Sequence, residues 1–165
     1  MASWKSTDQR VVPQAITDVS TVQNLPLGTI IGARHETYGA GEFIYLKGAT
    51  STAAGSWVTY NMDDGTTTLL AGNAVGPVAI AMAANDASTK YGWYQISGKA
   101  VGKAADVNDN ANVYVDSVPG QVDDAVVVGD YVFRAKFASD DDTATGTAEV
   151  EIERPFITDQ DQDDT

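Results

Sequence analysis

The stretch TAEVEIERPFI, residues 147–157, decides the fold class because apolar and polar side chains alternate along it. Ala148, Val150 and Ile152 fall on one side of an extended chain, and threonine and glutamate side chains fall on the other. The alternation predicts a β-strand with one buried and one solvated face. Pro155 lacks an amide hydrogen, so we expect it to break the hydrogen-bond ladder or to lie at a sheet edge.

Similar segments recur at intervals of about ten residues from Leu27 onward, and turn signals such as MDDG and SVPG separate them. They are rich in valine, threonine and tyrosine, which favours strands over helices. Short strands at this spacing predict an all-β fold, a compact β-barrel or β-sandwich. The expected strands are LGTIIGAR (27–34), EFIYLKG (42–48), WVTYN (57–61), TTTLL (66–70), VGPVAIAMAA (75–84), YGWYQISGKAV (91–101), NVYVD (112–116), QVDDAVV (121–127), YVFRAKFAS (131–139) and TAEVEIERPFI (147–157).

Three pairs of these segments follow one another in the same order at nearly the same offset. WVTYN and NVYVD begin 55 residues apart, the segments at Val75 and Val128 begin 53 apart, and those at Gly92 and Gly146 begin 54 apart. This predicts two copies of one unit: strand, turn, short strand, long strand, loop, strand. The alternative is chance, because short β-segments resemble one another easily.

The two ends of the chain differ from the middle. Residues 1–27 combine two prolines and many Ser, Thr and Gln residues with isolated apolar side chains. This composition favours an N-terminal arm that orders on a partner surface, and a frayed terminus is the alternative. Residues 158–165, TDQDQDDT, carry four Asp residues and no apolar side chain, which predicts a disordered acidic tail. Residues 28–157 are the predicted β-domain.

Composition excludes several classes of function. The chain has 23 acidic and 10 basic residues, a net charge of −13, so a surface for nucleic acid is not expected. It contains no cysteine, which excludes disulfides and thiolate chemistry and is compatible with synthesis in a reducing cytoplasm. No apolar window is long enough to span a membrane, and the polar start MASWKSTDQR lacks the apolar core of a secretory signal.

Catalytic patterns are also missing from the sequence. His35 is the one histidine and stands in a polar loop, where we expect a surface or hydrogen-bonding residue rather than a catalytic base. Gly39 and Gly41 lack the third glycine and the lysine of a phosphate-binding loop, and they are interpreted as turn residues. We therefore expect no enzyme activity, no catalytic residue and no cofactor.

Clustered carboxylates raise the possibility of acid pairs or calcium. The acidic clusters at 63–64, 123–124 and 140–142 lie among Gly, Thr, Ala and Ser, not among apolar residues that would raise a carboxyl pKa. ADVNDNAN (105–112) and SDDDTATG (139–146) are the candidate calcium loops, but neither has the twelve-residue spacing of an EF-hand. We expect no metal site.

The aromatic stretch YGWYQISGKA, residues 91–100, is the strongest candidate for a contact surface. Strand alternation puts Trp93 on one face and Tyr94 with Ile96 on the other, and Tyr94 and Ile96 are expected to face inward. Trp93 is expected on the solvated face as a subunit contact; a ligand platform or burial under a loop are the alternatives. A carbohydrate-binding module would use Trp57, Trp93 and Tyr94 as its stacking surface.

Three longer runs carry a family resemblance. They are YGAGEFIYLKGATSTAAGSWVTYN (38–61), GNAVGPVAIAMAANDASTKYGWYQISGKAV (72–101) and VYVDSVPGQVDDAVVVGDYV (113–132). In these runs, and from about Gly28 to Ile157, the chain resembles the head decoration, or cement, proteins of tailed bacteriophages. The resemblance lies in the amino-acid sequences of these segments and in their order along the chain. It includes no catalytic signature, so it assigns no functional residues.

The resemblance implies a compact β-domain on the outer face of a phage capsid, often a homotrimer, that clamps neighbouring copies of the major capsid protein. It implies a protein made in the host cytoplasm and located in the virion. The docking element is then the arm of residues 1–27 or the edge formed by EFIYLKG. The alternative function is a carbohydrate-binding head-fibre or adhesin module. The interface candidates are Trp4, Val11, Val12, Ile16, Phe43, Tyr45 and Trp93.

Overall fold

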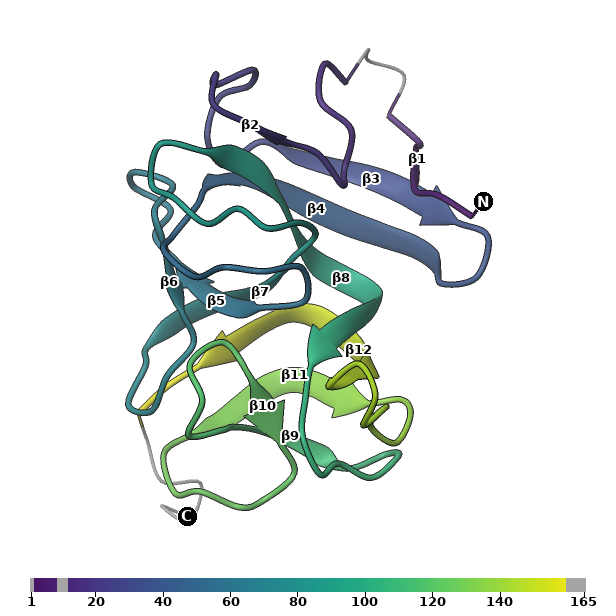
Figure 1. Cartoon of the computed structure of the whole chain (residues 1–165), viewed down its shortest axis with the longest axis vertical. Coiled ribbons are helices and arrows are strands. Elements are labelled where there is room, and N and C mark those ends of the chain that lie inside the picture. The colour runs from purple at the N-terminus through teal and green to yellow at the C-terminus, as the bar shows by residue number, and fades with distance from the viewer. Residues whose placement is uncertain (1, 9–11, 160–165) are drawn as a thin grey trace.

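The computed structural model describes residues 2–8 and 12–159, and all regular structure there is β, without a helix (Figure 1). The strands pair antiparallel in one sheet that does not close, bent into a compact sandwich-like body, so the predicted fold class is confirmed. The twelve strands of these residues are β1 (Lys5–Ser6), β2 (Val19–Ser20), β3 (Ile30–His35), β4 (Gly39–Lys47), β5 (Trp57–Tyr60), β6 (Thr67–Leu69), β7 (Gly76–Ala81), β8 (Tyr91–Lys103), β9 (Asn112–Val115), β10 (Val122–Asp123), β11 (Tyr131–Phe137) and β12 (Thr147–Ile157).

The sheet contains two units with the same pairing scheme, as the repeat predicts. In the first, β5 pairs with β6 and β7, and β7 pairs with β8; in the second, β9 pairs with β10 and β11, and β11 pairs with β12. Corresponding turns end at Gly65 and Gly120, whose φ values of 69° and 81° lie in the left-handed region that favours glycine. Figure 1 shows the first unit in teal above the second, which is green and yellow.

Strand β8 joins the two units because its halves pair with different neighbours. Residues 91–98 pair with β4, and residues 97–103 pair with β12. The change occurs at Gly98, which has a φ of 99°. A Cβ on Gly98 would lie 2.3 Å from the carbonyl oxygen of Ala40, so the close approach of β4 also requires glycine there.

The strand that decided the fold class is β12, which has the bounds of the predicted segment. Ala148, Val150 and Ile152 are buried on its inner face. The ladder to β11 is interrupted near Pro155: Ile152 pairs with Ala135, and pairing resumes only at Phe156. Pro155 therefore interrupts the ladder without ending the strand.

Two expectations about strands are wrong. EFIYLKG is not a sheet edge, because β4 lies between β3 and β8 and pairs with both. In the segment QVDDAVV only Val122 and Asp123 form a strand, β10. Val126 and Val127 at its end, and the next residue Val128, lie exposed in a loop.

The buried side chains form three clusters. The largest is shared by the two units, a second lies between β4, β5, β7 and β8, and a third lies under the N-terminal segment. Because Ile44 and Leu46 enter the second cluster while Phe43 and Tyr45 enter the third, both faces of β4 are buried. The third cluster is the one that brings the interface candidates together.

Candidate functional site

The interface candidates meet in one place, the third cluster. Phe43, Tyr45 and Trp93 come from β4 and β8, and the N-terminal segment (residues 2–8 and 12–27) supplies the others. Val11 lies outside the described residues. The candidates in the cluster are Trp4, Val12, Ile16, Phe43, Tyr45 and Trp93. The described part of the predicted arm thus packs on the chain's own sheet, and its docking on a partner remains a prediction.

Gln14 fixes the N-terminal segment to the sheet. Its Nε2 donates to the carbonyl oxygens of Asp18 and Tyr91, both at 2.9 Å. Its Oε1 accepts from Asn24 Nδ2 at 3.0 Å and from the Tyr45 hydroxyl at 2.8 Å. The side chain is buried and every donor and acceptor is used, which makes the contact specific. Sequence reasoning missed Gln14, because a lone glutamine in a polar segment carries no periodic signal.

Trp93 is buried, which corrects the expectation that it faces solvent. Its indole Nε1 donates to the backbone oxygen of Gln14 at 3.0 Å, and its ring packs edge-on against Tyr45 with centroids 5.1 Å apart. The face assigned from alternation is right, but the N-terminal segment covers it. Trp57 and Tyr94 are also fully buried, so the stacking surface expected for a carbohydrate-binding module is absent.

Trp4 is the outer member of an aromatic group at the free side of the cluster. Its ring centroid lies 4.8 Å from that of Phe43 and 5.1 Å from that of His35. His35 stacks on Tyr38 at 4.7 Å, and its Nδ1 accepts from the backbone amides of Thr37 and Tyr38. His35 is therefore a hydrogen-bonding residue of the β3–β4 turn, as expected.

A pocket of about 260 Å³ adjoins this aromatic group. Its lining includes the aromatic side chains of Trp4 and Tyr38, Met82 with several small apolar residues, and the polar side chains of Gln95 and Lys99. The amide of Gln95 is already used, because its Nε2 donates to two backbone oxygens, one of them that of Lys99. The lining of the pocket is mainly apolar.

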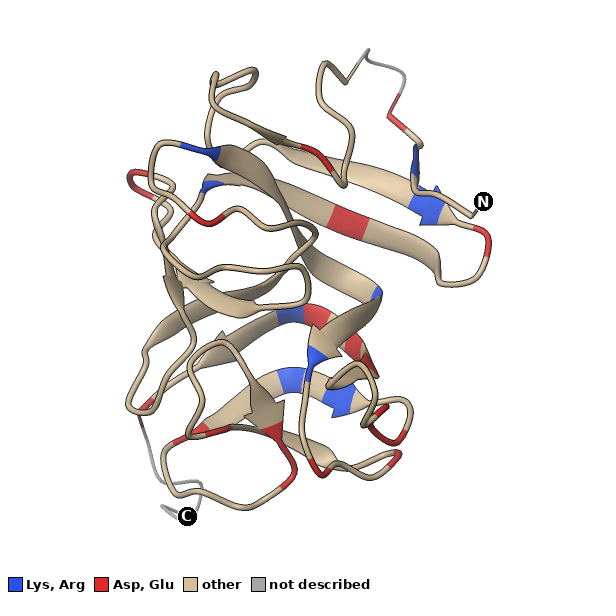
Figure 2. Cartoon of the chain, viewed as in Figure 1, with Lys and Arg blue, Asp and Glu red and all other residues tan. Residues whose placement is uncertain are grey.

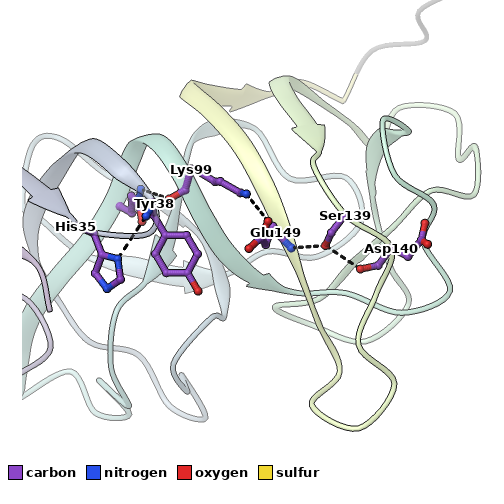
Figure 3. A network of polar contacts seen from close by, with 7 residues as sticks. His35, Tyr38, Lys99, Ser139, Asp140 and Glu149 are labelled. Atoms are coloured by element: carbon purple, nitrogen blue, oxygen red, sulfur yellow. Dashed lines mark hydrogen bonds and ion pairs between the residues drawn. The ribbon is translucent and has the colours of Figure 1, made fainter. Parts of the chain in front are cut away.

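The polar wall of the pocket leads into the second unit through a chain of contacts (Figure 3). Lys99 forms an ion pair with Glu149, and this contact raises the pKa of the Lys99 ammonium. The backbone amide of Glu149 donates to Ser139 Oγ at 3.0 Å, and that hydroxyl donates to the backbone oxygen of Asp140 at 2.8 Å. Lys99 is thus held in its charged form and is unsuited to act as a general base.

The two candidate calcium loops do meet, but their carboxylates bind backbone amides. Asp141 Oδ1 accepts from the amide of Val107 at 3.0 Å, and Asp140 Oδ1 accepts from the amide of Asp109 at 2.8 Å. The carboxylates thereby close one loop onto the other. Within the described ranges, no group of three or more His, Asp or Glu side chains is placed to hold a metal ion.

Two further observations bear on function. Among the residues with described structure, no helix is long and apolar enough to cross a membrane. Comparison of the chain with protein-family models, curated proteins and solved structures gives no match.

Proposed function

We propose that this chain is a virion structural protein that binds the outer face of a phage capsid and stabilises the shell by bridging capsid subunits. Its partners would be the major capsid protein and further copies of itself, as a homotrimer, and it would act without catalysis or a cofactor. The sequence resemblance over 28–157 supports this role, and the all-β body is compatible with it.

The observation that carries the proposal is the edge of β3. On the side of β3 away from β4, only Lys5 and Ser6 of β1 pair with this six-residue strand, opposite Arg34 and Ala33. The backbone amide of Thr7 also donates to the Gly32 carbonyl oxygen there at 3.0 Å. Within the described residues the rest of that edge is not paired by another strand, and Ile30 near its start is exposed. A capsid-protein segment that adds a strand here would bind through backbone hydrogen bonds.

Co-sedimentation with shells that lack the protein tests the role. We expect the purified chain to pellet with such shells at micromolar concentration and to raise the temperature at which filled shells release DNA. An unrelated acidic β-protein added at the same concentration is the control. Absence of co-sedimentation would contradict the proposal.

A shortened chain tests the edge. Deletion of residues 2–8 removes β1 and Trp4 but leaves Gln14, which fixes the remaining segment. We expect the body to stay folded. The affinity for shells should rise, because the whole β3 edge is then open to an added strand. Unchanged affinity would show that shells dock elsewhere on the molecule.

A further inference from the structure

The outer face of the second unit carries a row of aromatic rings, of which Phe133 and Phe156 are exposed, Tyr131 is half-buried and Tyr114 is buried. The Tyr114 and Tyr131 ring centroids lie 5.4 Å apart, and Tyr131 contacts Phe133 edge-on at 4.9 Å. Phe133 is paired in register with Phe156 on the next strand. Phe133 and Phe156 remain 39% and 41% exposed, although β11 and β12 each have neighbouring strands on both sides in the sheet. We call these four residues the aromatic face.

A double irregularity in the backbone places an arginine beside this face. The β11–β12 register shifts between Phe133 and Ala135, and Arg134 on β11 and Arg154 on β12 both adopt left-handed φ values, 59° and 47°. A side chain larger than glycine is strained in that region, and bulges re-aim side chains at functional sites. Arg154 binds Glu42 at 3.0 Å, whereas Arg134 forms no ion pair within the described residues. Its side chain lines an open groove with Tyr131 and Glu153, beside the ion pair of Lys136 and Glu151.

Carboxylates without a cation lie at the other end of the same face. Asp123 is paired in register with Tyr114, so both side chains project from the same side of the sheet. Burial and the nearby carboxylates of Asp116, Asp124 and Asp106 raise the pKa of Asp123. None of these four carboxylates has an ion pair in the described chain. Figure 2 shows acidic residues on the loops around β9 and β10, and basic residues on β11.

We propose that a second copy of this chain docks on the aromatic face, with Arg134 of one copy placed at the Asp123 carboxylate of the other. The face carries an unpaired cation at one end and unpaired carboxylates at the other, so two copies complement each other in charge. Exposed aromatic rings beside an arginine are the composition of an interface core. A two-fold contact forms this pair twice, and a three-fold ring forms it once at each contact.

The inference does not depend on the capsid role, because self-association is measured without shells. Sedimentation equilibrium at physiological ionic strength is the experiment, because at low salt the net charge of −13 on each copy would repel the other copy. We expect the wild-type chain to associate, and Arg134→Glu and Asp123→Lys each to weaken association at least about tenfold. The double variant restores the pair with reversed charges, and we expect its association constant within about threefold of the wild type. The measured mass gives the number of copies.

Two controls separate the contact from general charge effects and from misfolding. Arg34→Glu makes the same charge change on an exposed arginine of β3, in the other part of the molecule, and should leave association unchanged. Phe133→Thr with Phe156→Thr removes the apolar part of the face and should yield a monomer whose thermal unfolding remains cooperative. A monomeric wild-type chain, a double charge reversal without recovery, or an equal effect of Arg34→Glu would each overturn the proposal.

Discussion

At the scale of single residues, Gln14 makes the most specific contact of the N-terminal segment. Replacing it with leucine keeps a similar volume but removes the acceptor of the Tyr45 O–H and the side-chain donor to the Tyr91 carbonyl oxygen. We expect Gln14→Leu to lower the free energy of unfolding by about 2–4 kcal/mol, because unsatisfied buried polar groups are costly. Denaturant unfolding measures the change.

Gln23 in the same segment provides the matched control. It is exposed, and its side chain donates only to the nearby backbone oxygen of Leu25. Gln23→Leu is expected to change the free energy of unfolding by less than about 0.5 kcal/mol. Equal effects of the two substitutions would mean that the hydrogen bonds of Gln14 do not hold the segment in place.

The carboxylates around Asp123 predict a pH dependence of stability. The pKa of Asp123 is raised, so the folded chain binds this proton more tightly than the unfolded chain, and the charged form destabilises the fold. The penalty is present above the raised pKa and is gone below the ordinary value of 3.8. Asp123→Asn should therefore be more stable than the wild type at neutral pH and equally stable in acid.

Thermal unfolding across pH, at a concentration where the chain is monomeric, measures the effect of Asp123→Asn. The pKa of Asp64 is shifted in the opposite direction: the hydrogen bond from the Thr66 hydroxyl lowers it. Asp64→Asn should not stabilise the chain at any pH. If both variants were more stable than the wild type at neutral pH, the cause would be the lower net negative charge of the chain, not the carboxylates around Asp123.

At the scale of elements, Gly98 determines how β8 passes from one unit to the other. An alanine there would place its Cβ against the Ala40 carbonyl oxygen and would also have to adopt a φ of 99°. We expect Gly98→Ala to cost about 3 kcal/mol or more in denaturant unfolding. Gly39→Ala is the control: its φ is 76° but its Cβ would meet nothing within 4 Å, so only a conformational cost of about 1 kcal/mol applies. If Gly98→Ala and Gly39→Ala lowered the free energy of unfolding equally, the contact with the Ala40 carbonyl oxygen would not be the reason for glycine at position 98.

The strands that could be predicted from sequence are those in which apolar and polar residues alternate, so that the strand's own sequence shows which side chains are buried. β12 is such a strand, because one face meets the core and the other meets solvent. The faces of Trp93 and Tyr94 were also assigned correctly, since they follow from the period of two. The burial of Trp93 could not be predicted, because it depends on Gln14 and Ile16, which lie far away in the sequence and in no regular pattern.

At the scale of the whole molecule, the fold class and the two units followed from spacing, whereas the strands through which the units join did not. Pairing between β8 and β12 and between β7 and β12 connects segments about fifty residues or more apart, and local patterns carry no register for such contacts. The aromatic face was missed for the same reason. Phe133 and Phe156 become neighbours only through the β11–β12 register.

The shared core implies that neither unit folds alone. The first unit supplies Trp57 and Leu70 to the same cluster that contains Val132 and Phe137 of the second, and β12 requires β8 along its first seven residues. A fragment of residues 104–159 keeps all four strands of the second unit, yet it would expose the inner face of β12 and bury too little apolar surface for a chain of its length. We expect this fragment to give the circular dichroism and amide dispersion of an unfolded chain, while the full chain unfolds in one transition by tryptophan fluorescence and circular dichroism alike. A cooperatively folded fragment would mean that the units are independent domains and that the shared cluster adds little to their stability.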